Sequence, residues 1–176
     1  MKQLWAPWRI EYILSPKSGP CIFCEYPRKG KDEDRNSLIL HRGRLCYVMM
    51  NKYPYNGGHL MVVPFRHVHD LEGLEEEALF ELAALTKRTM NCLARVMRPE
   101  GFNVGLNIGK AAGAGIEEHL HMHIVPRWTG DNSFMAVLDE VHVIPEHLLA
   151  TYDKLYPIFN ERPSGNKNEP ETKMKK

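Results

Sequence analysis

The sequence predicts an α+β domain built on a mainly antiparallel sheet. Short apolar runs come first, one long helical pattern follows, and further strand patterns and a second helix come after it. Strands and helices that are segregated in this way favour α+β architecture over the regular alternation of a parallel sheet. A length of 176 residues suits one domain with a sizeable core.

Three strands are expected before the long helix. The runs 37–41 and 45–50 flank Arg42-Gly43-Arg44, a sequence typical of a hairpin turn. Residues 51–58 are dense in turn-forming side chains, and 59–64 then form the third predicted strand. The sheet is therefore expected to begin near the N-terminus.

The long helix is expected over residues 74–98. Its apolar residues recur at three-, four- or eight-residue steps, so they form one stripe. They are Leu71, Leu74, Ala78, Leu82, Leu85, Leu93 and Val96. Glutamates in the first turn suit the positive end of the helix dipole, and Pro99 and Gly101 end the helix.

Two further strands and a C-terminal helix complete the predicted fold. Apolar and polar or small residues alternate over 102–108, which is typical of a half-buried strand. Small residues fill a loop over 109–115, and 118–126 form the fifth strand. The second helix is expected over 146–159. The expected sheet thus has five strands.

Composition limits the partners of this chain. Twenty-three basic and twenty-two acidic side chains give a formal charge of +1, which provides no bulk attraction for nucleic acid or a membrane. No apolar run reaches the roughly 18 residues of a membrane span. The chain begins without the apolar core of an export signal. We therefore expect a cytoplasmic protein.

The chain divides into three parts. We expect an N-terminal arm over 1–18, a single domain over 19–160 and a flexible tail over 161–176. Met174 is the only large apolar residue of the tail, which cannot bury enough surface to offset its ordering entropy.

The fifth predicted strand carries three histidines, His119, His121 and His123, at alternate positions. Alternate side chains of a strand share one face, at a spacing of roughly 7 Å. This spacing favours three separate roles around one ligand, although a His-x-His metal site or a histidine-rich surface strand would give the same pattern. A neutral imidazole is also a competent nucleophile when its other nitrogen is held as a donor.

The loop before these histidines favours an anion. Gly109, Gly113 and Gly115, together with the alanines at 111, 112 and 114, leave backbone N–H groups uncovered, as anion-binding nests require. Small-residue loops are common, so this signal gains its weight from its place directly before the histidines.

Together these residues resemble the histidine triad family. The run from His119 to Val125 fits His-x-His-x-His-x-x, Asn51 precedes His59 by eight residues, and the resemblance covers about residues 20 to 130. The sequences 113–118 and 126–135 further resemble the bacterial diadenosine tetraphosphate phosphorylase branch.

The resemblance implies a five-stranded antiparallel sheet with one long helix and a C-terminal helix, paired into a homodimer or a dimer of dimers. It also implies that residues 19–160 are one catalytic domain. His121 would attack the α-phosphorus and form a nucleotidyl-imidazole. The carbonyl of His119 would hold the proton on the far nitrogen of His121, and His123 and His59 would complete the hydrogen bonds around the phosphate.

The resemblance also implies a nucleotide site. Asn51 would bind the ribose, Asn107 and the loop at Gly113 and Gly115 would hold phosphate oxygens, and two residues would wall the base, Ile22 and Phe23. Ile116, Glu117 and Glu118 stand where the family often has a hydroxyl residue or glutamine, so backbone donors would hold the phosphate. Four residues after the triad could shape the polyphosphate end, namely Arg127, Trp128, Asp131 and Asn132.

Cys21-Ile22-Phe23-Cys24 has a spacing common in zinc sites, which need two further ligands. The resemblance supplies His67 and His119, with His69 as a substitute for His67, and implies structural zinc and no organic cofactor. A redox pair and plain buried cysteines remain open. Cys46 and Cys92 are expected to be inert core residues.

The implied activity is phosphorolysis of diadenosine tetraphosphate to ATP and ADP. A hydrolase of dinucleoside polyphosphates or nucleoside phosphoramidates would share the His121 intermediate. A nucleotide-binding protein without catalysis and a nucleic-acid-binding zinc module are the alternatives from other classes, and the neutral charge argues against the last.

Overall fold

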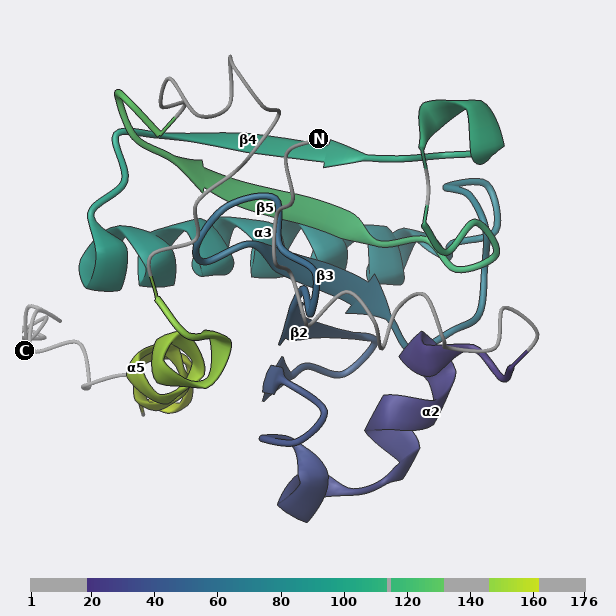
Figure 1. Ribbon diagram of the computed structural model, residues 1–176. Helices are drawn as coiled ribbons and strands as arrows, with labels where there is room; N and C mark the ends of the chain where they lie inside the picture. The colour runs from purple at the N-terminus through teal and green to yellow at the C-terminus, as the bar shows by residue number, and fades with distance from the viewer. Residues whose placement is uncertain (1–18, 114, 132–145, 162–176) are drawn as a thin grey trace, which may run out of the picture.

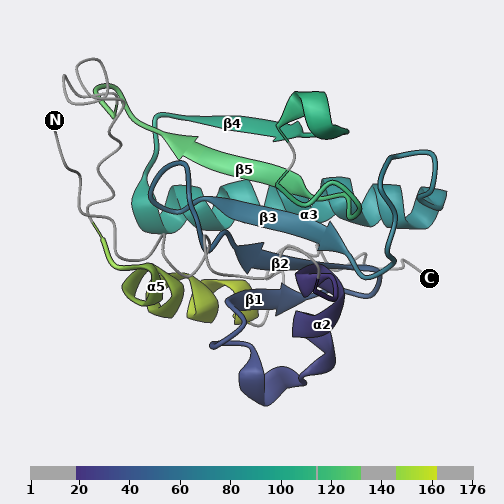
Figure 2. The same ribbon diagram turned by 45° about the vertical axis from the view of Figure 1, so that its right-hand side comes forward.

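The computed structural model describes residues 19–113, 115–131 and 146–161. Its centre is a five-stranded antiparallel sheet (Figure 1) in the order β1-β2-β3-β5-β4, with all five strands labelled in Figure 2. The strands are β1 (Ile39–Arg42), β2 (Cys46–Met50), β3 (Leu60–Pro64), β4 (Gly101–Leu106) and β5 (Met122–Arg127). The helices are α2 (Ile22–Arg28), α3 (Glu76–Met97) and α5 (Leu148–Asn160), with single 3-10 turns at η1 (Lys31–Glu33) and η2 (Lys110–Ala112). The predicted α+β fold is confirmed.

Two helices cover one face of the sheet. Figure 2 shows α3 running behind the strands and α5 beside β1, and α3 contacts β2, β3, β5 and α5. The helical stripe turns its buried residues to the sheet. They join alternate residues of β2 and β3, among them Val48 and Val62, in the main core.

The opposite face carries a smaller apolar cluster. Tyr47 and Met49 of β2 lie there with Met61 and Val63 of β3, and Phe23 of α2 packs against them. Both central strands are buried on both faces, which explains their unbroken apolar sequences. Helix α2 and the histidines belong to this second face.

Several boundaries differ from the prediction. Strand β1 begins at Ile39 because Leu38 has a left-handed backbone (φ 60°) that extended pairing cannot use. Arg42 pairs with Tyr47, so the hairpin turn lies at 43–45. Glu81 of α3 accepts hydrogen bonds from two backbone N–H groups of that turn. Leu71, which belongs to the predicted stripe, precedes α3 and is exposed.

The fifth strand is also shorter than predicted. Its pairing with β3 ends at Val62 and Met122, and the N–H of Leu120 instead donates to the carbonyl of Val68. His119 and His121 therefore lie in the segment that leads into β5. Strand β4 ends at Leu106, and Ile108 lies beyond it.

Some predictions fall outside the described residues. These are the arm over 1–18, the tail from residue 162 onward, and Asn132. Within the described ranges, no helix is both long enough and apolar enough to cross a bilayer.

Candidate active site

Four histidines meet on the face of the sheet opposite α3. His59 directly precedes β3, and the other three lie in or just before β5. All four are buried: His59 is 1%, His119 0%, His121 5% and His123 8% exposed. The ring centroid of His123 lies 4.6 Å from that of His121 and 5.1 Å from that of His59. Three of the rings therefore form one cluster.

Hydrogen bonds fix the protons of two of these histidines. The backbone N–H of Tyr55 donates to Nδ1 of His59 at 3.1 Å, so His59 carries its proton on Nε2. Nε2 of His59 lies 2.9 Å from Nδ1 of His123, which must then accept. His123 therefore carries its own proton on Nε2. That nitrogen is buried and has no partner among the described residues, so a donor is left for a ligand oxygen.

His121 is held in the opposite tautomer. Its Nδ1 donates to the carbonyl of His119 at 2.8 Å, which leaves the lone pair on Nε2. Within the described ranges, Nε2 of His121 makes no hydrogen bond. The ring of Phe23 supports that of His121 at a centroid distance of 4.8 Å. The arrangement presents an uncharged, oriented imidazole beside a hydrogen-bond donor.

Burial keeps the cluster neutral. It lowers the pKa of His59 to about 3 and that of His123 to about 4, with a further lowering from the neighbouring histidines. Burial also lowers the pKa of His121. Neutral imidazoles at pH 7 can serve as nucleophile and as donor without a prior loss of a proton.

These pKa values predict a pH dependence of stability. Between about pH 4 and 6.5 the unfolded chain binds protons on residues 59 and 123 that the folded chain does not bind. The free energy of unfolding therefore falls with decreasing pH in this window, by about 1.4 kcal/mol per pH unit for each extra proton. Urea unfolding at several pH values should show a shallower fall for His59→Gln than for wild type. His69→Gln, at an exposed position, is the control; equal slopes for all three would contradict these pKa shifts.

A second cluster lies beside the first. One ligand atom from each of Cys21, Cys24, His67 and His119 lies within 4.8 Å of the other three. Sγ of Cys21 is 3.3 Å from Nδ1 of His119, and Sγ of Cys24 is 3.3 Å from Nδ1 of His67. Nε2 of His119 donates to the carbonyl of Pro64, so Nδ1 faces the thiols with a lone pair.

This donor set fits a tetrahedral Zn²⁺ ion. Two thiols and two imidazoles are typical ligands of structural zinc, and the bond from His119 to a carbonyl is the second contact that such ligands make. His67 belongs to the group, whereas the substitute, His69, is exposed and pairs with Asp70. His119 thus links the two clusters, with its ring in one and its carbonyl in the other.

Comparison with known proteins identifies the family of this chain. The model of the HIT domain matches residues 32–130. AP-4-A phosphorylase of Mycobacterium tuberculosis is 42% identical over 160 residues, which covers 86% of this chain and 80% of that protein. The chain belongs to the HIT domain family. The resemblance to histidine triad proteins is thus confirmed.

Other HIT relatives agree with this assignment. The asymmetrical bis(5'-nucleosyl)-tetraphosphatase of Schizosaccharomyces pombe is 29% identical and covers 76% of this chain and 71% of its own. A crystal structure of a zinc-bound histidine triad family protein from Mycobacterium smegmatis superimposes with a TM-score of 0.61 at 23% identity, over 80% of this chain and 93% of that one. The similarity to the M. smegmatis structure supports a shared fold alone.

Among the predicted nucleotide-binding residues of this HIT chain, Asn51 contacts the histidine cluster directly, and Asn107, Gly113 and Gly115 lie between β4 and the triad in sequence. Nδ2 of Asn51 lies 3.4 Å from Nδ1 of His59. Gly113 has φ +79° in the loop after η2, where a side chain would be strained, and Gly115 is exposed beside it. Asn107 lies partly buried just after β4.

The two expected base-wall residues differ. Ile22 is 39% exposed and can offer an apolar surface, but Phe23 is only 2% exposed. Its ring packs beneath His121, and its carbonyl accepts from the hydroxyl of Tyr47. In this structure Phe23 offers little surface to a base, because the smaller apolar cluster holds it.

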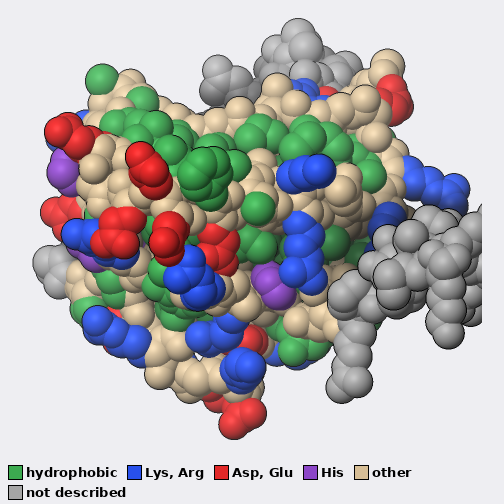
Figure 3. Space-filling model, turned by 180° about the vertical axis from the view of Figure 1, so that it is seen from behind, with side chains coloured by type: hydrophobic (Ala, Val, Ile, Leu, Met, Phe, Trp, Pro, Cys, Tyr) green, Lys and Arg blue, Asp and Glu red, His purple; other side chains and the backbone are tan. Residues whose placement is uncertain are grey.

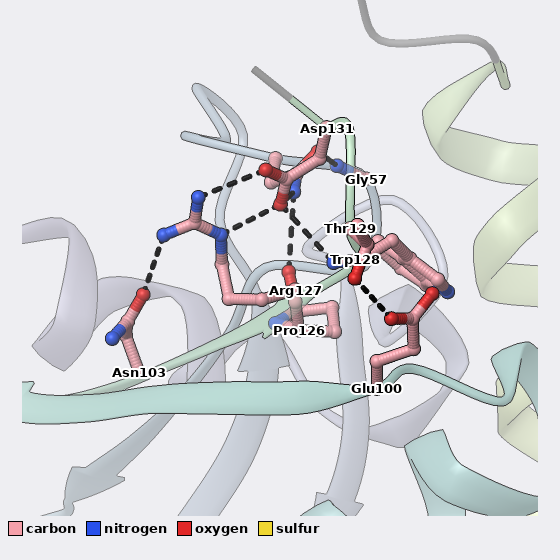
Figure 4. Close-up of polar contacts among 9 residues, drawn as sticks. Gly57, Glu100, Asn103, Pro126, Arg127, Trp128, Thr129 and Asp131 are labelled. Atoms are coloured by element: carbon pink, nitrogen blue, oxygen red, sulfur yellow. Dashed lines mark hydrogen bonds and ion pairs between the residues drawn. The ribbon is translucent and has the colours of Figure 1, made fainter.

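Residues after the triad are bound to one another. Asp131 accepts from Nε and Nη2 of Arg127 at 2.6 and 2.9 Å, and Nη1 of Arg127 donates to Asn103 at 2.7 Å (Figure 4). The guanidinium is therefore committed to protein oxygens. This differs from our expectation that Arg127 and Asp131 shape the polyphosphate end.

The remaining cysteines behave as predicted. Cys46 and Cys92 are buried in the main core, and burial raises the pKa of the Cys46 thiol to about 12. All four cysteines are free thiols.

Sequence reasoning did not find the contacts of Tyr55 or the cluster around Asp131, because a backbone N–H and a loop contact leave no periodic signal.

Proposed function

We propose that this protein transfers a nucleotidyl group from a dinucleoside polyphosphate to inorganic phosphate through His121. With diadenosine tetraphosphate the products are ATP and ADP. The free lone pair on Nε2 of His121, set by the bond from Nδ1 to the carbonyl of His119, carries the proposal. The name of the M. tuberculosis relative, AP-4-A phosphorylase, supports the same reaction.

The first displacement uses the two oriented imidazoles. Nε2 of His121 attacks the α-phosphorus, the N–P bond forms, and the P–O bond to the leaving ATP breaks. Charge on the phosphate oxygens increases during the attack. The N–H at Nε2 of His123 can stabilise it, because burial preorganises that donor.

The second displacement regenerates the enzyme. An oxygen of inorganic phosphate attacks the nucleotidyl-imidazole, the N–P bond breaks, and ADP leaves while the electron pair returns to Nε2 of His121. Water in place of phosphate would give AMP, which is the hydrolase alternative. The S. pombe relative, named a tetraphosphatase, supports keeping that alternative.

Substrate contacts follow from the placement of the neighbouring residues. We assign Asn51 to the ribose and Ile22 to one wall of the base. Asn107 and the loop at Gly113 and Gly115 are assigned to phosphate oxygens, because this loop is exposed and its glycines allow a close approach. The N–H of Gly113 already donates to the carbonyl of Lys110 at 3.1 Å, so the proposed backbone donor is Gly115.

The Cys/His group is proposed to hold a structural zinc ion. Cys21 and Cys24 at the start of α2 would be joined to His67 and to His119, so that the metal anchors α2 against the segment that enters β5. The ion supplies rigidity, and the chemical steps use only imidazoles and phosphate oxygens. No organic cofactor is required.

Association into a homodimer, or a dimer of dimers, fits the exposed apolar residues. Leu79 is 45% and Phe80 74% exposed on α3, while Val104 is 43% exposed on β4, an edge strand whose outer side has no partner among the described strands. Figure 3 shows hydrophobic side chains gathered along one border of the face behind the sheet. The free thiols suit the reducing cytoplasm.

Product analysis tests the choice of acceptor. Diadenosine tetraphosphate incubated with the protein and phosphate should give ADP and ATP in equal amounts, since each displacement releases one of them. Labelled phosphate should appear in ADP alone. AMP and ATP, with no label in ADP, would establish the hydrolase instead. Unconverted substrate that still binds would indicate a nucleotide-binding protein without catalysis.

A further inference from the structure

We infer that Asp131 is a positioning residue for the pair of His59 and His123, which presents a hydrogen-bond donor to the substrate. It acts through Asn56 and the turn over residues 51–58, which it holds from outside the histidine cluster. The kinetic part of this inference rests on the proposed function, whereas the tautomer part can be tested without any substrate.

The carboxylate of Asp131 collects donors from separate segments. Its two oxygens accept from Arg127 at the end of β5, and Oδ2 also accepts from the N–H of Trp128 at 3.2 Å (Figure 4). The remaining donor is Nδ2 of Asn56, 2.9 Å from Oδ2. These bonds with Arg127 hold the pKa of Asp131 at about 2, so the acceptor is ionised throughout the physiological range. Asp131 thus connects the turn over residues 51–58 to the C-terminal end of β5 through hydrogen bonds.

Asn56 is fixed at both ends of its side chain. Nδ2 also reaches the carbonyl of Pro126 at 3.2 Å, and Oδ1 accepts from the N–H of Gly57 at 3.0 Å. The main-chain carbonyl of Asn56 accepts from the N–H of His59 at 3.2 Å. The side chain that Asp131 holds therefore belongs to a residue that holds the backbone of His59.

Tyr55, the neighbour of Asn56, transmits the position of the turn to the imidazoles. Its N–H is the donor that forces the proton of His59 onto Nε2, and its ring lies against that of His59 at a centroid distance of 4.7 Å. If the turn moves, this donor leaves Nδ1. His59 can then carry its proton on either nitrogen, and the donor at Nε2 of His123 is no longer guaranteed.

Substrate binding is a poorer explanation for this cluster. The guanidinium of Arg127 already donates to Asp131 and Asn103. The negative charge of the Asp131 carboxylate would also repel a polyphosphate. Both polar atoms of the Asn56 amide already form hydrogen bonds with protein groups. The effect of Asp131 should therefore fall on the chemical step and leave substrate affinity unchanged.

Steady-state kinetics of the full chain test the inference. Asn56→Ala and Asp131→Ala should each lower kcat about ten-fold, part of the roughly 10²–10³ that one preorganised hydrogen-bond donor contributes, with KM unchanged. Asp131→Asn should retain most activity because its amide oxygen can still accept from Asn56. Asp153→Ala is the matched control: Asp153 receives the same two-bond contact from Arg35 at an exposed site, and its loss should change nothing.

Histidine tautomers provide the second readout. Long-range ¹H–¹⁵N spectra of the substrate-free wild type should show His59 and His123 protonated on Nε2, and Asn56→Ala should show His59 in mixed tautomers. Thermal unfolding confirms that each variant is folded; if one is not, the other alanine variant carries the test. Unchanged kcat and tautomers, or a raised KM at unchanged kcat, would overturn the inference. A wild type with these tautomers but no turnover would refute only the proposed function.

Discussion

His121→Ala should lower kcat for diadenosine tetraphosphate by roughly 10⁴-fold or more, as expected when a covalent nucleophile is removed. The remaining imidazoles cannot replace it. Nδ1 of His123 is occupied by His59 and its Nε2 carries a proton, while Nδ1 of His119 faces the two thiols. Nucleotide affinity should change little, because the binding residues remain.

Two variants control this experiment. His121→Asn can still donate to the carbonyl of His119, so it should fold as wild type does and be as inactive as the alanine variant. His69→Ala removes an exposed histidine that pairs only with Asp70 among the described residues, and should keep full activity. Turnover by His121→Ala within ten-fold of wild type would show that another group attacks the phosphorus.

Loss of a zinc ligand should have the second largest effect. Protein purified without a histidine tag should contain about one zinc per chain. The Cys24→Ser variant should contain less than a few tenths of a zinc ion per chain. Its free energy of unfolding should fall by several kcal/mol, because binding of structural zinc contributes directly to folding. Turnover should fall as well, since the carbonyl that orients His121 belongs to His119, one of the four ligands.

Cys92→Ala is the control for the zinc experiment. Cys92 is buried in α3 and lies outside the group of four, so this variant should keep its zinc and lose only the stability of a small core truncation. Zinc content that is low in wild type, or equal in wild type and Cys24→Ser, would leave the cysteines as a redox pair or as plain buried thiols.

The sequence predicted the elements whose signal is periodic. The stripe of α3 shows a helical repeat, and β2 and β3 are continuous apolar runs because both of their faces are buried. The triad was also visible, because residues of one type at alternate positions stand out against an apolar background. These parts of the fold and of the site could be read before the structure was known.

Other features depend on contacts between distant segments. Helix α2 has seven residues, too few for a clear repeat, and contains Pro27. Strand β5 begins later than predicted because the N–H of Leu120 donates to the carbonyl of Val68 and not to β3. Phe23 became a buried support for His121 because α2 docks on the smaller apolar cluster. None of these partners can be inferred from local sequence.

Rapid-quench mass spectrometry tests the central claim most directly. Wild-type protein mixed with diadenosine tetraphosphate in the absence of phosphate, and stopped in alkali, should yield a peptide that carries one adenylyl group on His121. Added phosphate should discharge this adduct as ADP. Product that accumulates with no adduct on any peptide, or an adduct on a residue other than His121, would contradict the account.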